Sequence, residues 1–273
     1  MSKEKLEDKI TRLETEGKFD ENVIPFNKKR VGEMNPKKFK YMPTHPLAKF
    51  VNLLIRIFLW FLGPIVNLIF FHLQIRGKKK LKCIRYRGAI VVANHVHFLD
   101  PLYLRQVAFS RNIYYLAARE NNRKGLVGMV FRIAGVLPLS SDFQVAKKLD
   151  KAVGDVLKKQ QILAIYAEQS LWLGYRKIRP LKPGAFHYAI KYDSPVVPVV
   201  TLFRNLSWWD KLIGRRFKLR LQICDPIFPD KTLRPKEAMN KMCEQCHESM
   251  VKCANEFYGT ECDAAKLLQQ KNT

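Results

Sequence analysis

The stretch VVANHVHFLDP, residues 91–101, joins a strand pattern to the start of a helix. Small and β-branched residues ahead of Asn94 are typical of a buried strand. Asp100 followed by Pro101 is typical of a helix N-terminus, with the aspartate as the cap. This order places His95 in a loop at the carboxyl end of the strand, where open α/β sheets bind ligands. The loop can fold back and bring Asp100 within reach of the His95 imidazole.

Outward from this stretch, the chain alternates between strand and helix patterns. The clearest helix is predicted over 142–160, where Ser141 and Gln144 match a capping box. Residues 73–260 are therefore predicted to form a single α/β domain with a mixed, largely parallel central sheet flanked by helices. Residues 261–273 are predicted to be a C-terminal tail. Strands are predicted at 73–76, 89–93, 113–117, 136–139, 162–167, 196–203 and 217–223.

Residues 47–72 form a strongly hydrophobic segment with Gly63-Pro64 near its centre. A helix that spans a membrane needs about 20 apolar residues in a row, and the Gly-Pro pair is expected to bend or break the helix. We therefore predict an N-terminal hydrophobic helical hairpin that inserts into one leaflet. A buried pair of core helices and a single kinked span are the alternatives. The predicted membrane-contact residues are Arg56, Trp60, Phe61, Phe70 and Phe71.

The composition is strongly basic, with 49 Lys and Arg against 24 Asp and Glu and a net charge of +25. Such a charge indicates a polyanionic partner: nucleic acid, an acidic substrate or an anionic membrane surface. No zinc motif or RNA-binding signature accompanies the charge, so no nucleic-acid partner is predicted. Residues 1–46 are predicted to be a short charged helix followed by a basic linker.

Six cysteines without a secretory signal indicate a reducing compartment. Cys243, Cys246 and His247 match the CxxCH pattern of haem attachment. Apolar residues recur around them at spacings of three and four, which is typical of one packed helix face. Packing is therefore the favoured interpretation, and no metal site is predicted. The residues of this face are Met239, Met242, Cys246, Met250, Cys253 and Phe257.

The pairing of His95 with Asp100 indicates general-base chemistry. A carboxylate fixes the tautomer of a histidine and stabilises the imidazolium that forms, so the histidine can take a proton from an alcohol. Spacing alone leaves a second interpretation open, in which Asp100 only caps a helix and His95 bonds to the backbone.

The motif NHVHFLD, residues 94–100, resembles the NHxxxxD signature of the glycerolipid acyltransferases, which include 1-acylglycerol-3-phosphate and glycerol-phosphate acyltransferases. The resemblance continues through RENNRKGLVGMVFRIAGVLPLSSD, AIYAEQS, LKPGAFHYAI and SPVVPVV. It implies that His95 deprotonates the acceptor hydroxyl while Asp100 orients His95. It also implies that the alkoxide attacks the thioester of acyl-CoA or acyl-carrier protein directly. No cofactor beyond this acyl co-substrate is implied.

Two departures from the family pattern affect recognition of the acceptor. The family's Glu-Gly-Thr block is Glu168-Gln169-Ser170 here, so a glycine that allows close backbone approach is missing. The arginine that the family places at the end of the middle block falls near Ser141. Other cations could compensate, although solvated surface charge is the favoured interpretation for each of them: Arg119, Arg123, Lys124, Arg176, Lys177, Arg179 and Lys182. The predicted substrate-binding residues are Asn94, Arg119, Ser141, Glu168, Gln169, Ser170 and Lys182.

These features predict a membrane-associated O-acyltransferase of phospholipid biosynthesis, peripheral or monotopic on the cytoplasmic face of a membrane. It would move a fatty acyl chain from acyl-CoA or acyl-carrier protein to the hydroxyl of a lysophospholipid such as 1-acylglycerol-3-phosphate. Its expected partners are an anionic membrane surface, the lysophospholipid acceptor and the acyl donor. The alternatives are a glycerol-3-phosphate or glycolipid acyltransferase, and a nonenzymatic membrane- or polyanion-binding relative.

Overall fold

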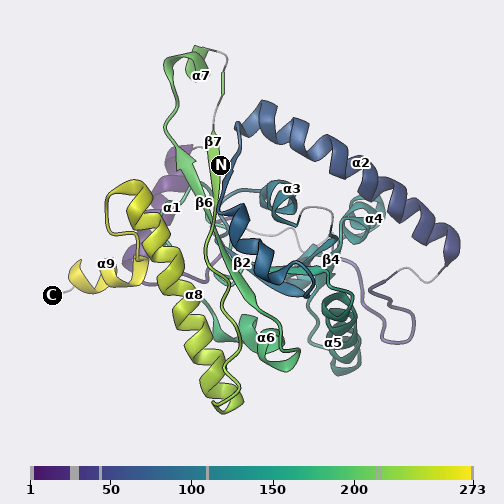
Figure 1. Ribbon diagram of the computed structural model, residues 1–273. Helices are drawn as coiled ribbons and strands as arrows, with labels where there is room; N and C mark the ends of the chain where they lie inside the picture. The colour runs from purple at the N-terminus through teal and green to yellow at the C-terminus, as the bar shows by residue number, and fades with distance from the viewer. Residues whose placement is uncertain are drawn as a thin grey trace.

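A central sheet organises the computed structural model, which describes residues 3–24, 31–42, 45–108, 111–212, 214–215 and 217–271 (Figure 1). Its seven strands lie in the order β1-β7-β6-β2-β5-β3-β4. The β6–β7 pair is antiparallel, and the other neighbouring pairs are parallel. The strands are β1 (Gln74–Arg76), β2 (Ala89–Ala93), β3 (Ile113–Ala117), β4 (Val136–Pro138), β5 (Ile162–Ile165), β6 (Val196–Arg204) and β7 (Lys218–Ile223). All seven lie where the sequence predicts them, and the predicted α/β class is confirmed.

Helices cover both faces of this sheet and build a hydrophobic core on each. Ile90 and Val92 of β2 pack into the core beneath α5, α6 and α8, whereas Val91 and Ala93 pack into the core beneath α2 and α3. Every residue of β2 is buried, as expected for a parallel strand covered on both sides. The helices are α1 (Lys3–Thr15), α2 (Pro46–Phe71), α3 (Asp100–Leu104), α4 (Gly125–Ile133), α5 (Phe143–Lys158), α6 (His187–Lys191), α7 (Trp208–Leu212), α8 (Pro235–Tyr258) and α9 (Ala264–Lys271), with short 3-10 turns at Lys78–Ile84, Arg105–Val107, Arg119–Asn121 and Pro183–Phe186.

Helix α5 shows how a local signal sets a helix start. Its N-cap is Asp142, whose Oδ1 accepts a hydrogen bond from the Val145 backbone N–H at 3.0 Å. The predicted cap at Ser141 is therefore wrong by one residue, because the carboxylate of Asp142 takes the amide that the serine hydroxyl was expected to take. On α8, the predicted apolar face is confirmed: Cys246 and Met250 are fully buried in the core.

Helix α2 is one continuous helix over Pro46–Phe71, so the predicted hairpin is wrong. Pro64 removes one backbone donor, but the helix is held to the domain on both sides of it, which lets the helix continue past the proline. Before Pro64, the Arg56 guanidinium lies 4.6 Å from the centre of the Tyr114 ring. After Pro64, Asn67 Nδ2 donates to the Leu102 carbonyl at 3.4 Å. The helix ends at Phe71, and its C-cap His72 has a left-handed φ of 43°.

The two faces of α2 have the reverse of the usual polarity. The face toward the domain carries Asn52, Arg56 and Asn67, and Arg56 and Asn67 are almost fully buried. The predicted membrane contact is thus wrong for Arg56 and Phe71, because both side chains pack against the domain. Arg56 is 8% exposed and Phe71 is 4% exposed. Outward-facing residues are apolar and exposed: Phe50, Leu53, Leu54, Ile57, Phe58, Trp60, Phe61, Ile65, Leu68, Ile69 and Phe70. Among the described residues, the stretch Lys49–Phe71 is long and apolar enough to cross a membrane, with a mean hydropathy of 2.1.

The N-terminal segment folds onto the domain. Leu13 and Val23 are buried together with Trp172 and Tyr175 in a small third core. The Trp172 Nε1 donates to the Glu21 carbonyl at 2.9 Å. The predicted basic linker falls partly on residues 25–30 and 43–44, which lie outside the described residues. The segment predicted as a C-terminal tail contains helix α9.

Candidate active site

The loop after β2 brings His95 and Asp100 into direct contact. His95 Nδ1 lies 2.7 Å from Asp100 Oδ2, so the ring donates a hydrogen bond to the carboxylate. Asp100 is the first residue of α3, and its side chain turns back to bond the loop instead of capping the helix. With Nδ1 occupied by Asp100, Nε2 is the nitrogen left to take a proton from a substrate.

Asp100 is held by the backbone as well as by the imidazole. Its Oδ2 also accepts from the N–H groups of Val96 at 2.9 Å and His97 at 3.2 Å, and the residue is 1% exposed. Burial raises the pKa of Asp100, and the hydrogen bonds from His95, Val96 and His97 oppose this rise. A carboxylate fixed by several donors gives the histidine one orientation and one tautomer.

Aromatic rings position the rest of the loop. The His95 ring stacks on Tyr166, with centroids 4.2 Å apart and planes 19° apart. Burial raises the pKa of Tyr166 well above its usual value, so this ring stays neutral beside the histidine. His97 packs edge-on against Phe71 of α2 and Phe217, each at 5.3 Å. Burial lowers the pKa of His97, which is consistent with a structural role for the second histidine of the motif.

Glu168 supports His95 from behind. Its Oε2 accepts from the His95 backbone N–H at 3.1 Å and from Arg179 Nη2 at 2.7 Å. Its Oε1 accepts from the Arg179 backbone N–H at 3.0 Å. Glu168 is 1% exposed and does not line the pocket. The prediction that Glu168 binds substrate is therefore wrong, because its carboxylate is used to bond the His95 loop and Arg179.

Arg179 is the residue that sequence reasoning missed. It was expected to be a solvated surface charge, but it is fully buried and its guanidinium packs 4.8 Å from the Trp172 ring centre. Its Nη1 donates to the Phe19 carbonyl and Ser170 Oγ, and its Nη2 donates to the Ser170 carbonyl and Glu168. The signal that could have found it was Glu168, because an acid at the end of a buried strand needs a cation nearby.

The other predicted substrate-binding residues divide into those that line the pocket and those that do not. Asn94 is buried and exchanges two hydrogen bonds with the backbone of Thr201, which ties β2 to β6. Ser170 is buried against Arg179, while Arg119 and Ser141 are exposed and lie outside the pocket. Lys182 lines the pocket and pairs with Asp20 at 3.1 Å.

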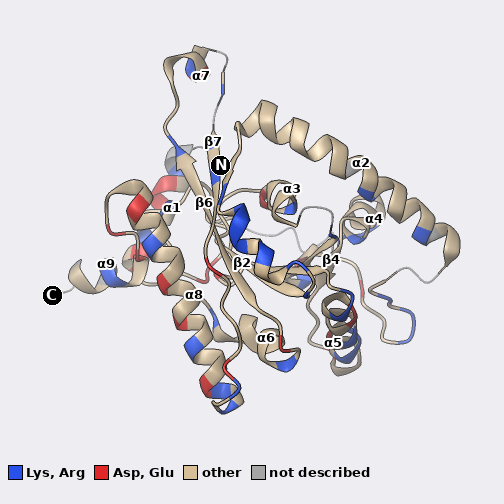
Figure 2. Ribbon diagram, in the orientation of Figure 1, with Lys and Arg blue, Asp and Glu red and all other residues tan. Residues whose placement is uncertain are grey.

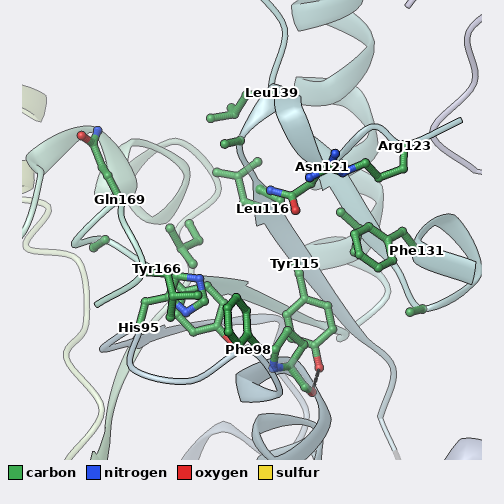
Figure 3. A pocket seen from close by; sticks show the side chains of 18 of the residues that line it. His95, Phe98, Tyr115, Leu116, Asn121, Arg123, Phe131, Leu139, Tyr166 and Gln169 are labelled. Carbon is green, nitrogen blue, oxygen red and sulfur yellow. Dashed lines mark hydrogen bonds between the residues drawn. The ribbon is translucent and has the colours of Figure 1, made fainter. Parts of the chain in front are cut away.

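Gln169 occupies the position where the family pattern has glycine, and it lines the pocket. Its φ is +67°, in the left-handed region that glycine adopts without a steric penalty. The backbone therefore keeps the glycine-like turn although the side chain is present. Figure 3 shows the Gln169 side chain on the same side of the pocket as His95 and Tyr166.

A large pocket opens beside His95, with a volume of about 1980 Å³. It is bounded by the ends of β3 and β5, by α4 and by residues of the N-terminal segment. Most of its lining is apolar or aromatic, including Phe98, Tyr115, Leu116, Phe131 and Leu139 (Figure 3). Its cations are Arg105, Arg123, Lys124 and Lys182. Such a cavity can hold a long apolar chain with a polar group near His95.

Fold and site together define an α/β protein in which a histidine, bonded to a buried carboxylate, lies at the carboxyl edge of a largely parallel sheet. The family model described as "Acyltransferase" matches residues 72–202, a range that contains both His95 and Asp100. Over residues 72–202 the chain therefore matches the acyltransferase family, which agrees with the family resemblance predicted from the sequence.

The chain is similar to two known proteins. It is 24% identical over 142 residues to 1-acyl-sn-glycerol-3-phosphate acyltransferase beta from Homo sapiens, an alignment that covers 52% of this chain and 50% of the relative. The chain thus matches about half the length of this curated relative. The crystal structure of the 1-acyl-sn-glycerophosphate (LPA) acyltransferase PlsC from Thermotoga maritima has a TM-score of 0.48 and 19% identity, covering 74% of this chain and 80% of that chain.

Replacing Asp100 with asparagine is expected to lower kcat for acyl transfer roughly 10²- to 10⁴-fold, because an amide can stabilise the wrong imidazole tautomer and carries no charge to balance the imidazolium. Steady-state acyl-transfer assays would measure the loss. Asp142→Asn, at the cap of α5, is the matched control and should keep full activity. Full activity in Asp100→Asn would mean that Asp100 only shapes the loop.

Proposed function

We propose that this chain is a membrane-associated O-acyltransferase that moves a fatty acyl chain from an acyl thioester to the free hydroxyl of a lysophospholipid, such as 1-acylglycerol-3-phosphate. One observation carries the proposal: the 2.7 Å contact between His95 and a buried Asp100 beside an apolar pocket of about 1980 Å³. The acyltransferase family match and the name of the human relative support the same reaction class.

The proposed reaction needs one proton carrier. His95 Nε2 takes the proton of the acceptor hydroxyl as the hydroxyl oxygen attacks the thioester carbonyl. The C–O ester bond forms and the C–S bond breaks, and the thiolate takes the proton back from the imidazolium. Asp100 stabilises the imidazolium between these two steps. No acyl-enzyme is required, so His95 acts as a base and not as a nucleophile.

The acceptor phosphate would meet Arg105, which follows α3 and lines the pocket. Within the described part of the chain, this guanidinium has no acidic partner; its Nη2 donates to the Arg56 carbonyl at 3.4 Å and its Nε is buried without a partner. Burial lowers the pKa of Arg105, and the neighbouring Arg56 adds to this effect. An anion at this end of the pocket would relieve the unpaired charge.

Arg105→Met is therefore expected to raise KM for a phosphate-bearing acceptor roughly tenfold to hundredfold, the equivalent of one or two charged hydrogen bonds. KM for a neutral monoacylglycerol should not change. Parallel assays with CoA and dephospho-CoA thioesters would show whether the lost phosphate contact belongs to the donor. Arg132→Met, an exposed arginine on α4, is the control. An equal rise in KM for both acceptors would contradict a phosphate contact at Arg105.

Membrane association is proposed from the reversed polarity of α2. An apolar outer face of this size is typical of a surface that contacts another protein or a membrane, and a lipid acceptor favours the membrane. The polar inner face of α2 packs against the domain. Helix α2 would therefore lie in the plane of the membrane–water interface, with its outer face in one leaflet. The proposed location is the cytoplasmic face of a membrane, with anionic lipid facing the basic protein.

The test of the proposed function is an acyl-transfer assay in detergent with palmitoyl-CoA. Lysophosphatidic acid, glycerol-3-phosphate and a neutral lysolipid are offered in parallel, and the series is repeated with acyl-carrier protein as donor. Turnover of lysophosphatidic acid supports the proposed acceptor. Turnover confined to another acceptor keeps the reaction but changes the substrate. No turnover with any pair of substrates would leave the nonenzymatic alternative.

A further inference from the structure

The turn between β6 and β7 exposes two tryptophans at the end of a projecting hairpin. Figure 1 shows helix α7 at the tip of this hairpin, beyond the edge of the sheet. Trp208 and Trp209 stack with centroids 3.9 Å apart and remain 65% and 58% exposed, and Leu212 beside them is 68% exposed. Three large apolar side chains that face water on one short helix indicate a contact surface, because such groups are normally covered.

A buried acid fixes the shape of this tip. Asp210 Oδ2 accepts from the Ser207 backbone N–H at 2.8 Å and from Lys218 Nζ at 2.6 Å, and Asp210 Oδ1 accepts from Arg215 Nη1 at 2.8 Å. The hydrogen bonds from Lys218 and Ser207 hold the pKa of Asp210 well below its usual range. These bonds tie Ser207 and helix α7 to Arg215 and to the start of β7, so less conformational entropy is lost when the tryptophans bind.

The hairpin is joined to the end of α2. Arg215 Nη2 donates to the Ile69 carbonyl at 3.2 Å, and Arg215 Nη1 lies 3.1 Å from His72 Nδ1. Arg204 Nη1 donates to the His72 carbonyl at 3.2 Å. The exposed face of α2, which ends with Leu68, Ile69 and Phe70, therefore continues toward the tryptophans of the hairpin.

Charge around the tip favours an anionic surface. Residues 204–212, 214–215 and 217–218 carry the acid Asp210 against four cations, which leaves three excess positive charges even though Arg215 and Lys218 both pair with Asp210. The other two cations are Arg204 and the exposed Lys211. Figure 2 shows basic segments and no acidic patch on the outer part of this hairpin or along α2. Tryptophan prefers the headgroup region of a bilayer, and lysine and arginine beside it can reach the phosphates.

The tip also lies at the functional edge of the sheet. Strand β6 runs parallel to β2, so the chain leaves β6 toward α7 at the same edge where it leaves β2 toward His95. Tyr86, which precedes β2 and is 72% exposed, lies at the opposite edge. A bilayer that binds the tip would thus face the edge that carries the pocket.

We propose that Trp208, Trp209 and Leu212 form a second membrane anchor, which inserts into the headgroup region of an anionic bilayer and, together with α2, fixes the pocket toward the lipid. This inference rests on the membrane association proposed above. In this proposal the hairpin orients the protein on the membrane and takes no part in the chemistry of His95 and Asp100.

Fluorescence quenching tests the anchor directly, because the chain contains four tryptophans. In full-length protein with Trp60→Phe, the remaining residues are the fully buried Trp172 and the two hairpin tryptophans. Vesicles of phosphatidylcholine and phosphatidylglycerol with brominated acyl chains should quench this emission, more strongly when the bromines lie near the headgroups. Adding Trp208→Phe and Trp209→Phe should abolish the quenching, since Trp172 is shielded by protein.

Vesicle flotation provides the second measurement. Trp208→Ser with Trp209→Ser should weaken binding to the same vesicles about tenfold or more, as expected for removing two inserted aromatic side chains. Tyr86→Ser at the opposite edge should bind like wild type, and turnover of a short-chain substrate in detergent should be unchanged in both variants.

The outcomes separate the two proposals. Wild-type binding to vesicles with unquenched hairpin tryptophans would overturn the second anchor and leave membrane association intact. No wild-type binding to vesicles would overturn both. Unquenched tryptophans together with a raised KM for acyl-carrier protein in the double serine variant would assign the tip to that acidic protein and overturn the anchor.

Discussion

His95→Ala is expected to lower kcat/KM for acyl transfer by about 10⁴-fold, because the acceptor hydroxyl loses the base that removes its proton. Asp100 holds the imidazole at Nδ1, and Tyr166 stacks on its ring. Among the described residues, no other histidine at this edge of the sheet pairs with a buried carboxylate. Initial rates with acyl-CoA and a lysophospholipid would measure the loss. Since His95 is partly exposed and its backbone contacts remain in the variant, the fold should be preserved.

The matched control for this experiment is His187→Ala. His187 lines the same pocket, but no described acid pairs with it, so its removal should change kcat/KM only slightly. Vesicle binding of both variants should equal that of wild type, because neither residue belongs to α2 or to the β6–β7 hairpin. Wild-type activity in His95→Ala would refute general-base catalysis by this residue.

Arg179→Met is expected to lower the free energy of unfolding by about 3–5 kcal/mol, the usual cost of leaving one member of a buried ion pair without its partner. The variant removes four side-chain hydrogen bonds that tie Glu168, Ser170 and Phe19 together. Glu168 would then be a buried carboxylate whose remaining donors are two backbone amides. Denaturant unfolding in the detergent used for purification would measure the change.

Two comparisons make this result specific. Arg176→Met removes an exposed arginine nearby and should cost less than about 1 kcal/mol. Glu168→Gln combined with Arg179→Met should recover part of the lost stability, because the double variant no longer buries a lone charge. A single Arg179→Met variant as stable as wild type would show that the buried pair does not hold the loop behind His95.

The strands and the motif could be predicted because their signals are local. Ala89–Ala93 consists of small and β-branched residues, and its burial on both faces follows from that composition. The contact between His95 and Asp100 follows from a strand, a loop and a helix start in immediate succession.

The continuous α2 and the buried Arg179 could not be predicted, because both depend on residues distant in the sequence. Pro64 predicts a break, but Tyr114 and Leu102 hold the helix on either side of it. Arg179 looks like a surface charge in a stretch with three other cations. Its burial depends on Glu168, Trp172 and a backbone carbonyl of the N-terminal segment.

The bonds between the N-terminal segment and Arg179 have a consequence for synthesis of the chain. The Phe19 carbonyl accepts hydrogen bonds from Arg179 and Ser170, which lie 160 and 151 residues further along. During translation, Phe19 leaves the ribosome long before either partner exists, and contacts of such long range form late in folding. The contacts behind the loop that carries His95 can therefore be completed only after residue 179 has been made, so a nascent chain shorter than this would lack the predicted support of His95.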